Sequence, residues 1–228
     1  MVGAPTYRVP VSRSTRPLLP VVLLAGGVAL AGCGSSAATG SAGGHEGHDA
    51  PATVEGPDDR YAGIDLPEPY QRPSFTLTDT SGGSFDFAAE TGGKPTLLFF
   101  GYTQCPDVCP ATMADVAVAL RKTDPAVAEQ VQMVFVTTDP KTDDPKVLGE
   151  YLDRFDADLP TQFIGLTGKQ DVIDQAQLSA GVPLAEEDGR QHSSLLLLYT
   201  ADDEAPVAFD TGNTPEDIAG DLALATGS

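Results

Sequence analysis

Short apolar runs alternate with segments of helical periodicity along residues 73–228. Residues 73–79 and 84–87 alternate apolar and polar side chains around the turn at 80–83, a pattern that predicts a β-hairpin. Apolar, β-branched runs predict strands over 95–100, 131–137, 163–166 and 193–200, and a last strand over 206–209 follows the turn at 201–204. Helical spacing predicts helices ending near 122, over 144–155 and over 169–178, and a last helix with Thr214 as N-cap and Asp217 completing a near capping box.

This order of elements predicts one α/β domain. Strands that alternate with helices form a central sheet covered by helices on its faces. We therefore expect a central mixed sheet flanked by helices, with an N-terminal β-hairpin.

The stretch Gly101-Tyr102-Thr103-Gln104-Cys105-Pro106-Asp107-Val108-Cys109-Pro110 lies between the strand at 95–100 and the helix that follows, and it contains two of the three cysteines. Pro110 suits the first turn of a helix. Free N–H groups and the helix dipole favour thiolate over thiol at a helix N-terminus. A thiolate attacks disulfides and also binds soft metal ions, so both chemistries are open here.

The spacing of Cys105 and Cys109 leaves several arrangements open. If both residues are helical, they share one face, because positions i and i+4 are neighbours. The two sulfurs would then converge on a metal ion, form a redox-active disulfide, or form a static structural disulfide. A dithiol at the C-terminal end of the first core strand implies a thioredoxin-like fold, since ligand sites in such sheets lie at the carboxyl ends of strands.

The N-terminal 32 residues have the pattern of an export signal. Arg8, Arg13 and Arg16 precede an apolar run at 18–31, which is short for a membrane span. The run ends in Leu30-Ala31-Gly32-Cys33, which resembles the bacterial lipobox and implies a lipid on Cys33. The alternative is an uncleaved signal anchor with an incidental cysteine. With Cys33 lipidated, Cys105 and Cys109 remain as a pair.

Residues 33–65 lack any apolar period and are rich in Gly, Ala, Ser and Pro, which predicts a disordered tether. Its sequence His45-Glu46-Gly47-His48-Asp49 is either a weak site for a divalent metal or a polar linker. Residues 66–228 have the length of a single folded domain. The prediction is therefore a lipoprotein signal at 1–32, a tether at 33–65 and one domain at 66–228.

The charge of the chain argues against nucleic acid as a partner. The formal net charge is −20, and because the first 32 residues carry three arginines and no acid, the remainder carries −23. Phosphate binding needs clustered Lys and Arg, which this chain lacks.

The domain resembles the Sco/SenC family of thioredoxin-like copper chaperones from about Phe75 to the last helix. The strongest match is the run from Gly101 to Pro110, where the family has an aromatic residue, Thr, a variable residue, and then Cys-Pro-Asp-aliphatic-Cys-Pro. Weaker matches follow in order: Thr138-Asp139-Pro140 with Asp143 and Pro145, the run 163–168, and His192-Ser193-Ser194. Two positions depart from the family: Gln104 replaces a frequent His, and Thr142 replaces an Arg.

The resemblance implies a metal site and a partner. Cys105, Cys109 and His192 would bind copper as Cu(I) or Cu(II), and two thiolates with one imidazole suit Cu(I). His192 is the only histidine outside the tether. The protein would be a metallochaperone rather than an enzyme. Lipid-anchored on the outer face of the cytoplasmic membrane, it would deliver copper to the CuA centre of cytochrome c oxidase subunit II, or reduce the cysteines of that centre with electrons from a thiol reductant.

Other functions stay open from the residues alone. The main alternative is a thiol–disulfide oxidoreductase that uses Cys105 and Cys109 without delivering copper. A copper sensor or buffer would also use His45 and His48. A peroxidase-like enzyme needs a lone reactive cysteine, and here two cysteines look like partners. Three further side chains are weaker candidates. Asp107 either adjusts the basicity of the thiolates or is a turn residue, and Asp139 either contacts a metal ligand or caps a helix. Met113 is either a thioether ligand or a core residue.

Overall fold

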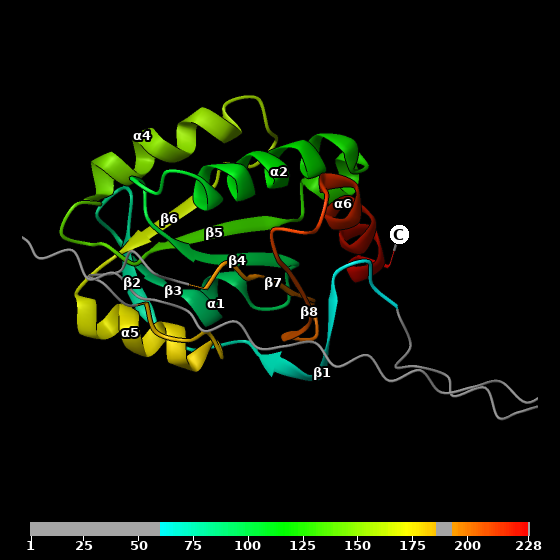
Figure 1. Cartoon of the computed structure of the whole chain (residues 1–228), viewed down its shortest axis with the longest axis horizontal. Helices are drawn as coiled ribbons and strands as arrows, with labels where there is room; N and C mark the ends of the chain where they lie inside the picture. The colour runs from blue at the N-terminus through cyan, green and yellow to red at the C-terminus, as the bar shows by residue number, and fades with distance from the viewer. Residues whose placement is uncertain (1–59, 186–192, 228) are drawn as a thin grey trace, which may run out of the picture. The chain divides into compact units, whose positions relative to one another are not determined.

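The computed structural model describes residues 60–185 and 193–227, all of which lie in one compact unit (Figure 1). The predictions for the signal, the lipid on Cys33 and most of the tether fall outside these residues. No helix in the described ranges has the length and apolar character needed to cross a membrane.

The unit contains one eight-stranded sheet with helices on both faces. In chain order the elements are β1 (Ile64–Gln71), β2 (Thr76–Asp79), β3 (Ser84–Asp86), α1 (Phe87–Thr91), β4 (Thr96–Gly101), α2 (Val108–Lys122), α3 (Pro125–Ala128), β5 (Gln132–Thr137), α4 (Pro145–Asp156), β6 (Ile164–Thr167), α5 (Gln170–Ser179), β7 (Leu196–Tyr199), β8 (Glu204–Phe209) and α6 (Pro215–Ala225).

The sheet is mixed and has the order β1-β8-β7-β4-β5-β6-β2-β3. Strands β4, β5 and β6 are parallel neighbours, while β7 and β2 pair antiparallel at the two sides of this parallel core. The predicted hairpin is confirmed, because β2 pairs antiparallel with β3. The mixed sheet flanked by helices confirms the predicted thioredoxin-like class.

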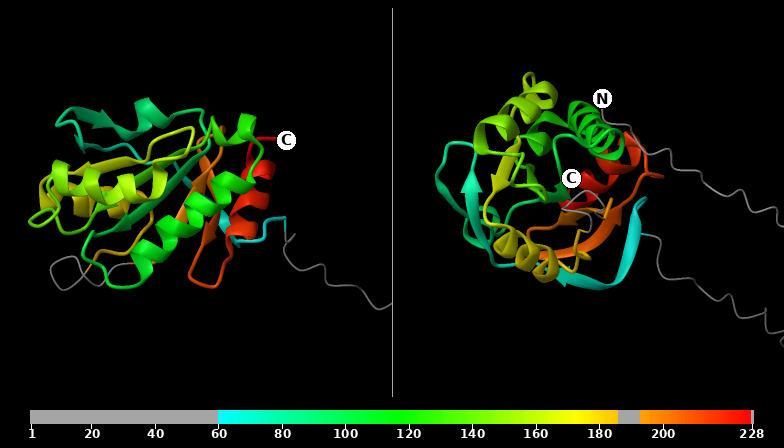
Figure 2. Two further views of the ribbon diagram at one scale, coloured as in Figure 1. Left: turned by 90° about the horizontal axis from the view of Figure 1, so that it is seen from above. Right: turned by 60° about the vertical axis from the view of Figure 1, so that its left-hand side comes forward.

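The central strand β4 is buried on both faces, so its side chains divide the core in two. Leu97 and Phe99 pack into one cluster together with residues of α2, α4 and α6. Leu98 and Phe100 point the other way and pack with residues of α1 and α5. This division follows from the alternation of side chains along a strand. Figure 2 shows the same two layers of helices from two further directions.

The last helix begins as its sequence predicts. The side chain of Thr214 accepts a hydrogen bond from the Asp217 N–H, and the Asp217 side chain accepts one from the Thr214 N–H. This reciprocal capping box satisfies two N–H groups that the first turn of a helix leaves unpaired.

Three elements are absent from the sequence prediction. Helices α1 and α3 have only 5 and 4 residues, too few for a periodic pattern. Strand β1 carries two prolines and an irregular register between Asp65 and Tyr70, and it lies at the sheet edge against β8. The predicted boundary between residues 65 and 66 falls within this strand. Strand β7 is shorter than the predicted 193–200.

Candidate functional site

The two cysteines lie at the transition from β4 to α2, at the carboxyl end of the parallel strands. Cys105 belongs to the loop between the two elements, and Cys109 is the second residue of α2. The arrangement with both cysteines inside one helix is therefore wrong.

Cys105 is placed to carry a negative charge. Its sulfur accepts a hydrogen bond from the Cys109 N–H at 3.4 Å, so a free N–H of the helix start points at the thiol. Partial burial opposes ionisation, but the backbone N–H groups of Cys109, Asp107 and Val108 outweigh it and lower the pKa of Cys105 below that of a free thiol. Cys105 is half-buried, so a reagent or partner can reach it.

Cys109 has the opposite character. It is fully buried in the core cluster below α2. Burial raises the pKa of its thiol well above the usual value. A hydrogen bond from the Tyr102 backbone opposes this shift, and the nearby charges of Cys105 and Asp143 add to it. A side-chain hydrogen bond joins the two thiols. The pair therefore has one accessible, acidic thiol and one protected thiol beside it.

Gly101 makes room for this pair at the end of β4. A methyl group at Gly101 would lie 2.8 Å from the Cys109 Sγ and 2.7 Å from the Phe99 ring. Both separations are shorter than the 3.0 Å below which Cβ atoms essentially never approach another heavy atom. The buried sulfur therefore lies directly against the backbone of β4, and only glycine allows that approach.

We expect Gly101→Ala to destabilise the fold by about 1–3 kcal/mol and to push Cys109 out of its position, because the new methyl group overpacks the core. Urea unfolding measures the first effect, and the alkylation rate of Cys109 measures the second. Gly220→Ala is the matched control. Apart from the neighbouring backbone of its own helix, no atom lies within 4 Å of the added methyl group, so this substitution in α6 is expected to raise stability by about 0.5–1 kcal/mol. Equal stability changes at the two glycines would contradict the proposed crowding.

A buried carboxylate, Asp143, holds the cysteine loop against the loop that follows β5. Its Oδ2 accepts hydrogen bonds from the Thr103 N–H at 2.9 Å and the Thr137 hydroxyl at 2.6 Å, and its Oδ1 accepts the Thr103 hydroxyl at 2.5 Å. The Thr167 hydroxyl donates to the Asp143 carbonyl oxygen at 3.0 Å, which brings in the end of β6. The sequence offered Asp143 only as a family match, because its partners are up to 40 residues away.

The weaker candidates are now distinguished. Met113 is fully buried in the core cluster, which confirms the core interpretation. Asp144, not Asp139, caps α4, so the capping role for Asp139 is wrong; Asp139 is buried beside the site, and its N–H donates to the Thr137 hydroxyl at 3.0 Å. Asp107 is the exposed N-cap residue of α2, and its side chain makes no capping hydrogen bond.

His192, the third predicted ligand, lies outside the described residues, as do Cys33, His45 and His48. The chain on its C-terminal side is described. In the antiparallel β4–β7 pair, Leu196 lies opposite Phe99, which is two residues before Gly101. Ser194 lines a small cavity of about 60 Å³ together with Val108 and Thr112 of α2. The segment that follows His192 therefore reaches the same end of the sheet as the cysteines.

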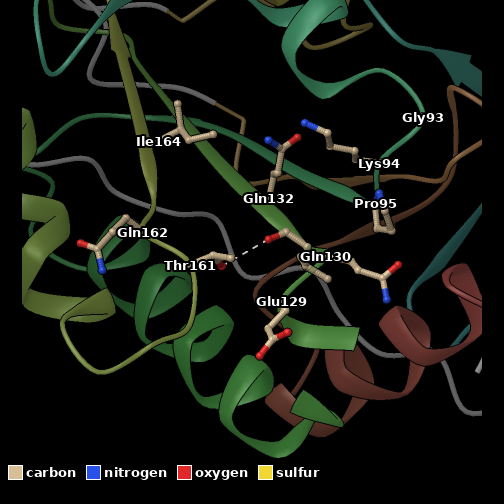
Figure 3. Close-up of a pocket in the computed structure, with 10 residues that line it drawn as sticks. Gly93, Lys94, Pro95, Glu129, Gln130, Gln132, Thr161, Gln162 and Ile164 are labelled. Carbon is tan, nitrogen blue, oxygen red and sulfur yellow. Dashed lines mark hydrogen bonds between the residues drawn. The ribbon is translucent and has the colours of Figure 1, made fainter. Parts of the chain in front are cut away.

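The opposite end of the sheet has a different character. A hollow of about 420 Å³ lies at the amino ends of β4, β5 and β6, and its lining includes the polar side chains of Lys94, Gln132 and Gln162 (Figure 3). No cysteine lines it. Within the described ranges, no three or more His, Cys, Asp or Glu side chains are grouped to hold a metal ion. Both cysteines of the described residues therefore lie at the carboxyl end of β4.

Comparison with known proteins gives consistent matches. The family model for SCO1/SenC matches residues 66–226. A protein of Stutzerimonas stutzeri is 34% identical over 144 residues, which cover 60% of this chain and 68% of the relative.

Two solved structures share the fold. The structure of Bradyrhizobium japonicum ScoI with copper bound has 32% sequence identity and a TM-score of 0.57, over 68% of this chain and 99% of that chain. The structure of BsSco, described as having a disulfide switch and as a member of the Sco family of cytochrome c oxidase assembly proteins, has 26% identity and a TM-score of 0.56, over 72% and 98% of the two chains.

Proposed function

The chain belongs to the SCO1/SenC family, and from that premise we propose that it is a copper-binding metallochaperone whose ligands are Cys105, Cys109 and His192. The observation that carries the proposal is the pair of adjacent thiols at the end of β4, one acidic and accessible and the other buried. Thiolates are soft ligands that select Cu(I), and the relative from Bradyrhizobium japonicum was solved with copper bound.

The position of Ser194 supports His192 as the third ligand. Ser194 lines a cavity with residues from the first turns of α2. Two residues of extended chain span at most about 7 Å, so the Cα atom of His192 is no farther than that from the Cα atom of Ser194. An imidazole on this segment would complete a three-ligand site with the two sulfurs.

The N-terminal region supplies the location in this proposal. A lipid on Cys33 would anchor the protein at the outer face of the cytoplasmic membrane, with the tether between the anchor and the domain. About 30 flexible residues have a typical end-to-end distance of about 30 Å, enough for the domain to reach a neighbouring membrane protein.

We propose the CuA centre of cytochrome c oxidase subunit II as the partner. BsSco is described as a member of a family of cytochrome c oxidase assembly proteins, which supports this choice. Copper is then the cargo: the protein holds it through the thiolates and releases it to the ligands of the apo-oxidase. The metal binds only the reduced pair, so the redox state of Cys105 and Cys109 controls loading.

A second function is favoured by the same asymmetry of the thiols. An accessible thiol of lowered pKa beside a buried thiol is the arrangement of a thiol–disulfide oxidoreductase, in which the first attacks and the second resolves the mixed disulfide. In that case the protein would reduce the cysteines of the partner and would need a thiol reductant of its own.

The deciding experiment is the stoichiometry and affinity of Cu(I) for the reduced protein. We expect one tightly bound Cu(I), lost in Cys105→Ser and Cys109→Ser. In His192→Ala we expect affinity to fall by more than about 100-fold, since losing even an outer-shell partner of a metal ligand costs 10–100-fold. Competition with a Cu(I) chelator measures both quantities.

Two controls separate the rival functions. Residues 34–228 and 53–228 are compared, because only the longer protein contains His45 and His48; equal affinities are expected, and loss of copper from the shorter one would favour a buffer built on the tether. Absence of copper in the reduced wild-type protein, with rapid turnover of protein disulfides, would establish the oxidoreductase instead.

A further inference from the structure

Tyr151 of α4 has a buried hydroxyl that makes no hydrogen bond with any of the described residues. Its side chain is 2% exposed, and the hydroxyl makes no hydrogen bond within the part of the chain that the structure describes. A buried polar group without a partner costs free energy comparable to a lost hydrogen bond. Such groups are few in folded proteins, and a functional site is a common reason for one.

The Tyr151 ring belongs to the same core cluster as Cys109. It packs against the Phe135 ring with centroids 5.6 Å apart. The Phe135 ring and the Cys109 sulfur both border Gly101. A methyl group on Gly101 would lie 3.2 Å from the Phe135 Cζ and 2.8 Å from the Cys109 Sγ. Cys109, Phe135 and Tyr151 therefore form one contiguous group in the core between α2, α4 and the sheet, and Figure 1 shows these two helices on the same side of the sheet.

The electrostatics agree with this placement. Burial raises the pKa of the Tyr151 hydroxyl well above its usual value. Negative charge on Cys109, Cys105 or Asp143 raises this pKa further, whereas the positive charge of Arg154 lowers it. Asp143 faces the site from the loop after β5, but its carboxylate already accepts three hydrogen bonds from Thr103 and Thr137.

We propose that Tyr151 is a positioning residue whose hydroxyl donates a hydrogen bond to the Cys109 sulfur when that sulfur acts as a metal ligand or as a nucleophile. In the dithiol the Cys109 thiol is engaged with Cys105 and its sulfur is a weak acceptor. A buried thiolate is a strong acceptor and needs a donor within the core. The proposal deepens the proposed function, since it concerns how one of the same sulfurs is held.

The metal-free reaction with Ellman's reagent tests the hydrogen bond without copper. The Cys105 thiolate first attacks the reagent, forming a mixed disulfide and releasing one thionitrobenzoate. Cys109 then loses its proton to solvent, and its sulfur attacks the Cys105 sulfur; the Cys105–Cys109 bond forms, the mixed disulfide breaks, and a second thionitrobenzoate leaves. The rate of this second release reports on the Cys109 thiolate, whereas the first reports on Cys105.

Cys33 is replaced by serine so that Cys105 and Cys109 are the only thiols of the full chain. With Tyr151→Phe added, we expect the second phase to slow by about tenfold or more, the effect of losing a hydrogen bond to a charged group, while the first phase is unchanged. The variant should fold normally, because it removes only a hydroxyl without a partner among the described residues. Tyr199→Phe is the matched control. Tyr199 is also fully buried with an unpartnered hydroxyl among those residues, but it packs into the core cluster on the other face of the sheet.

Copper affinity gives a second, independent readout. We expect Tyr151→Phe to bind Cu(I) about 10–100-fold more weakly than wild type and Tyr199→Phe to bind it equally well. If wild type binds no copper, the proposed function fails, and the second phase of the Ellman reaction still tests Tyr151. An unchanged second phase in Tyr151→Phe, or an equal slowing in Tyr199→Phe, would overturn the proposal.

Discussion

Replacing Asp143 by alanine is expected to destabilise the fold by about 3–5 kcal/mol. The substitution strands three donors that now share one carboxylate: the Thr103 N–H, the Thr103 hydroxyl and the Thr137 hydroxyl. Each buried donor left without an acceptor costs about 1–3 kcal/mol, and the hydroxyls recover part of this by rotating to new acceptors. Urea unfolding of the metal-free, reduced protein measures the change in the free energy of unfolding.

The same substitution should also disorganise the metal site, since Asp143 ties the cysteine loop to the loop after β5. We expect Cu(I) affinity to fall by about 10–100-fold, in line with the loss of a supporting partner near a metal ligand. Asp144→Ala is the matched control. Asp144 is exposed and caps α4 by accepting a hydrogen bond from the Val147 N–H at 2.8 Å, so its loss should cost about 1 kcal/mol and leave copper binding unchanged. If the two variants lose similar stability, Asp143 is not the anchor we describe.

Replacing Arg72 by methionine should cost about 2–4 kcal/mol in stability, because several partly buried hydrogen bonds are lost, and should leave the cysteine pair intact. The Arg72 side chain is 3% exposed and bonds to Asp203 at 2.6 Å. Its remaining N–H groups reach two threonine hydroxyls and two carbonyl oxygens, those of Thr91, Thr96, Lys94 and Thr200, and its guanidinium stacks 5.1 Å from the Tyr199 ring centre. Without the guanidinium, these acceptors and the carboxylate lose their donor.

The location of Arg72 explains why function should be spared. Thr96 begins β4, so this cluster lies at the opposite end of that strand from Gly101 and the cysteines. Arg72→Lys should recover only part of the loss, because an ammonium has three donors and no planar fork. Arg121→Met is the control: its ion pair with Asp158 is exposed and should be worth about 0–1 kcal/mol. Thermal and urea unfolding measure the stability of each variant, and Ellman kinetics measure the reactivity of its thiols. A loss of stability in Arg72→Met as small as that in Arg121→Met would refute the prediction.

Much of the scaffold is predictable from local sequence because its signals are local. The strand at β4 is a continuous apolar run, α4 has apolar residues at helical spacing, and α6 carries Thr214 and Asp217 in a capping box. Each pattern concerns residues that are close together in the sequence, so it can be recognised without knowledge of the tertiary contacts. The hairpin of β2 and β3 follows from its turn in the same way.

The elements that the sequence did not predict depend on distant partners. Strand β1 has no clean alternation, and it is a strand because β8 offers it an open edge. The N-terminal segment before it is held by the buried Asp221 of α6, whose carboxylate accepts hydrogen bonds from the Ala62 and Gly63 N–H groups at 2.9 Å, across 158 residues or more. No pattern in the segment itself records that contact.

For the candidate site, the sequence by itself determined that two thiols stand between a strand and a helix, and it identified the family that uses them. The tertiary structure decided which thiol is acidic and which is buried, because that depends on where α2 begins and on what covers its first turn. It also decided that Asp143 bonds to the cysteine loop, that Gly101 lies against the Cys109 sulfur, and that Tyr151 shares a core cluster with Cys109. Local patterns specify backbone conformation, whereas burial and long-range hydrogen bonds, which set the reactivity of a thiol, exist only once the sheet and helices have packed together.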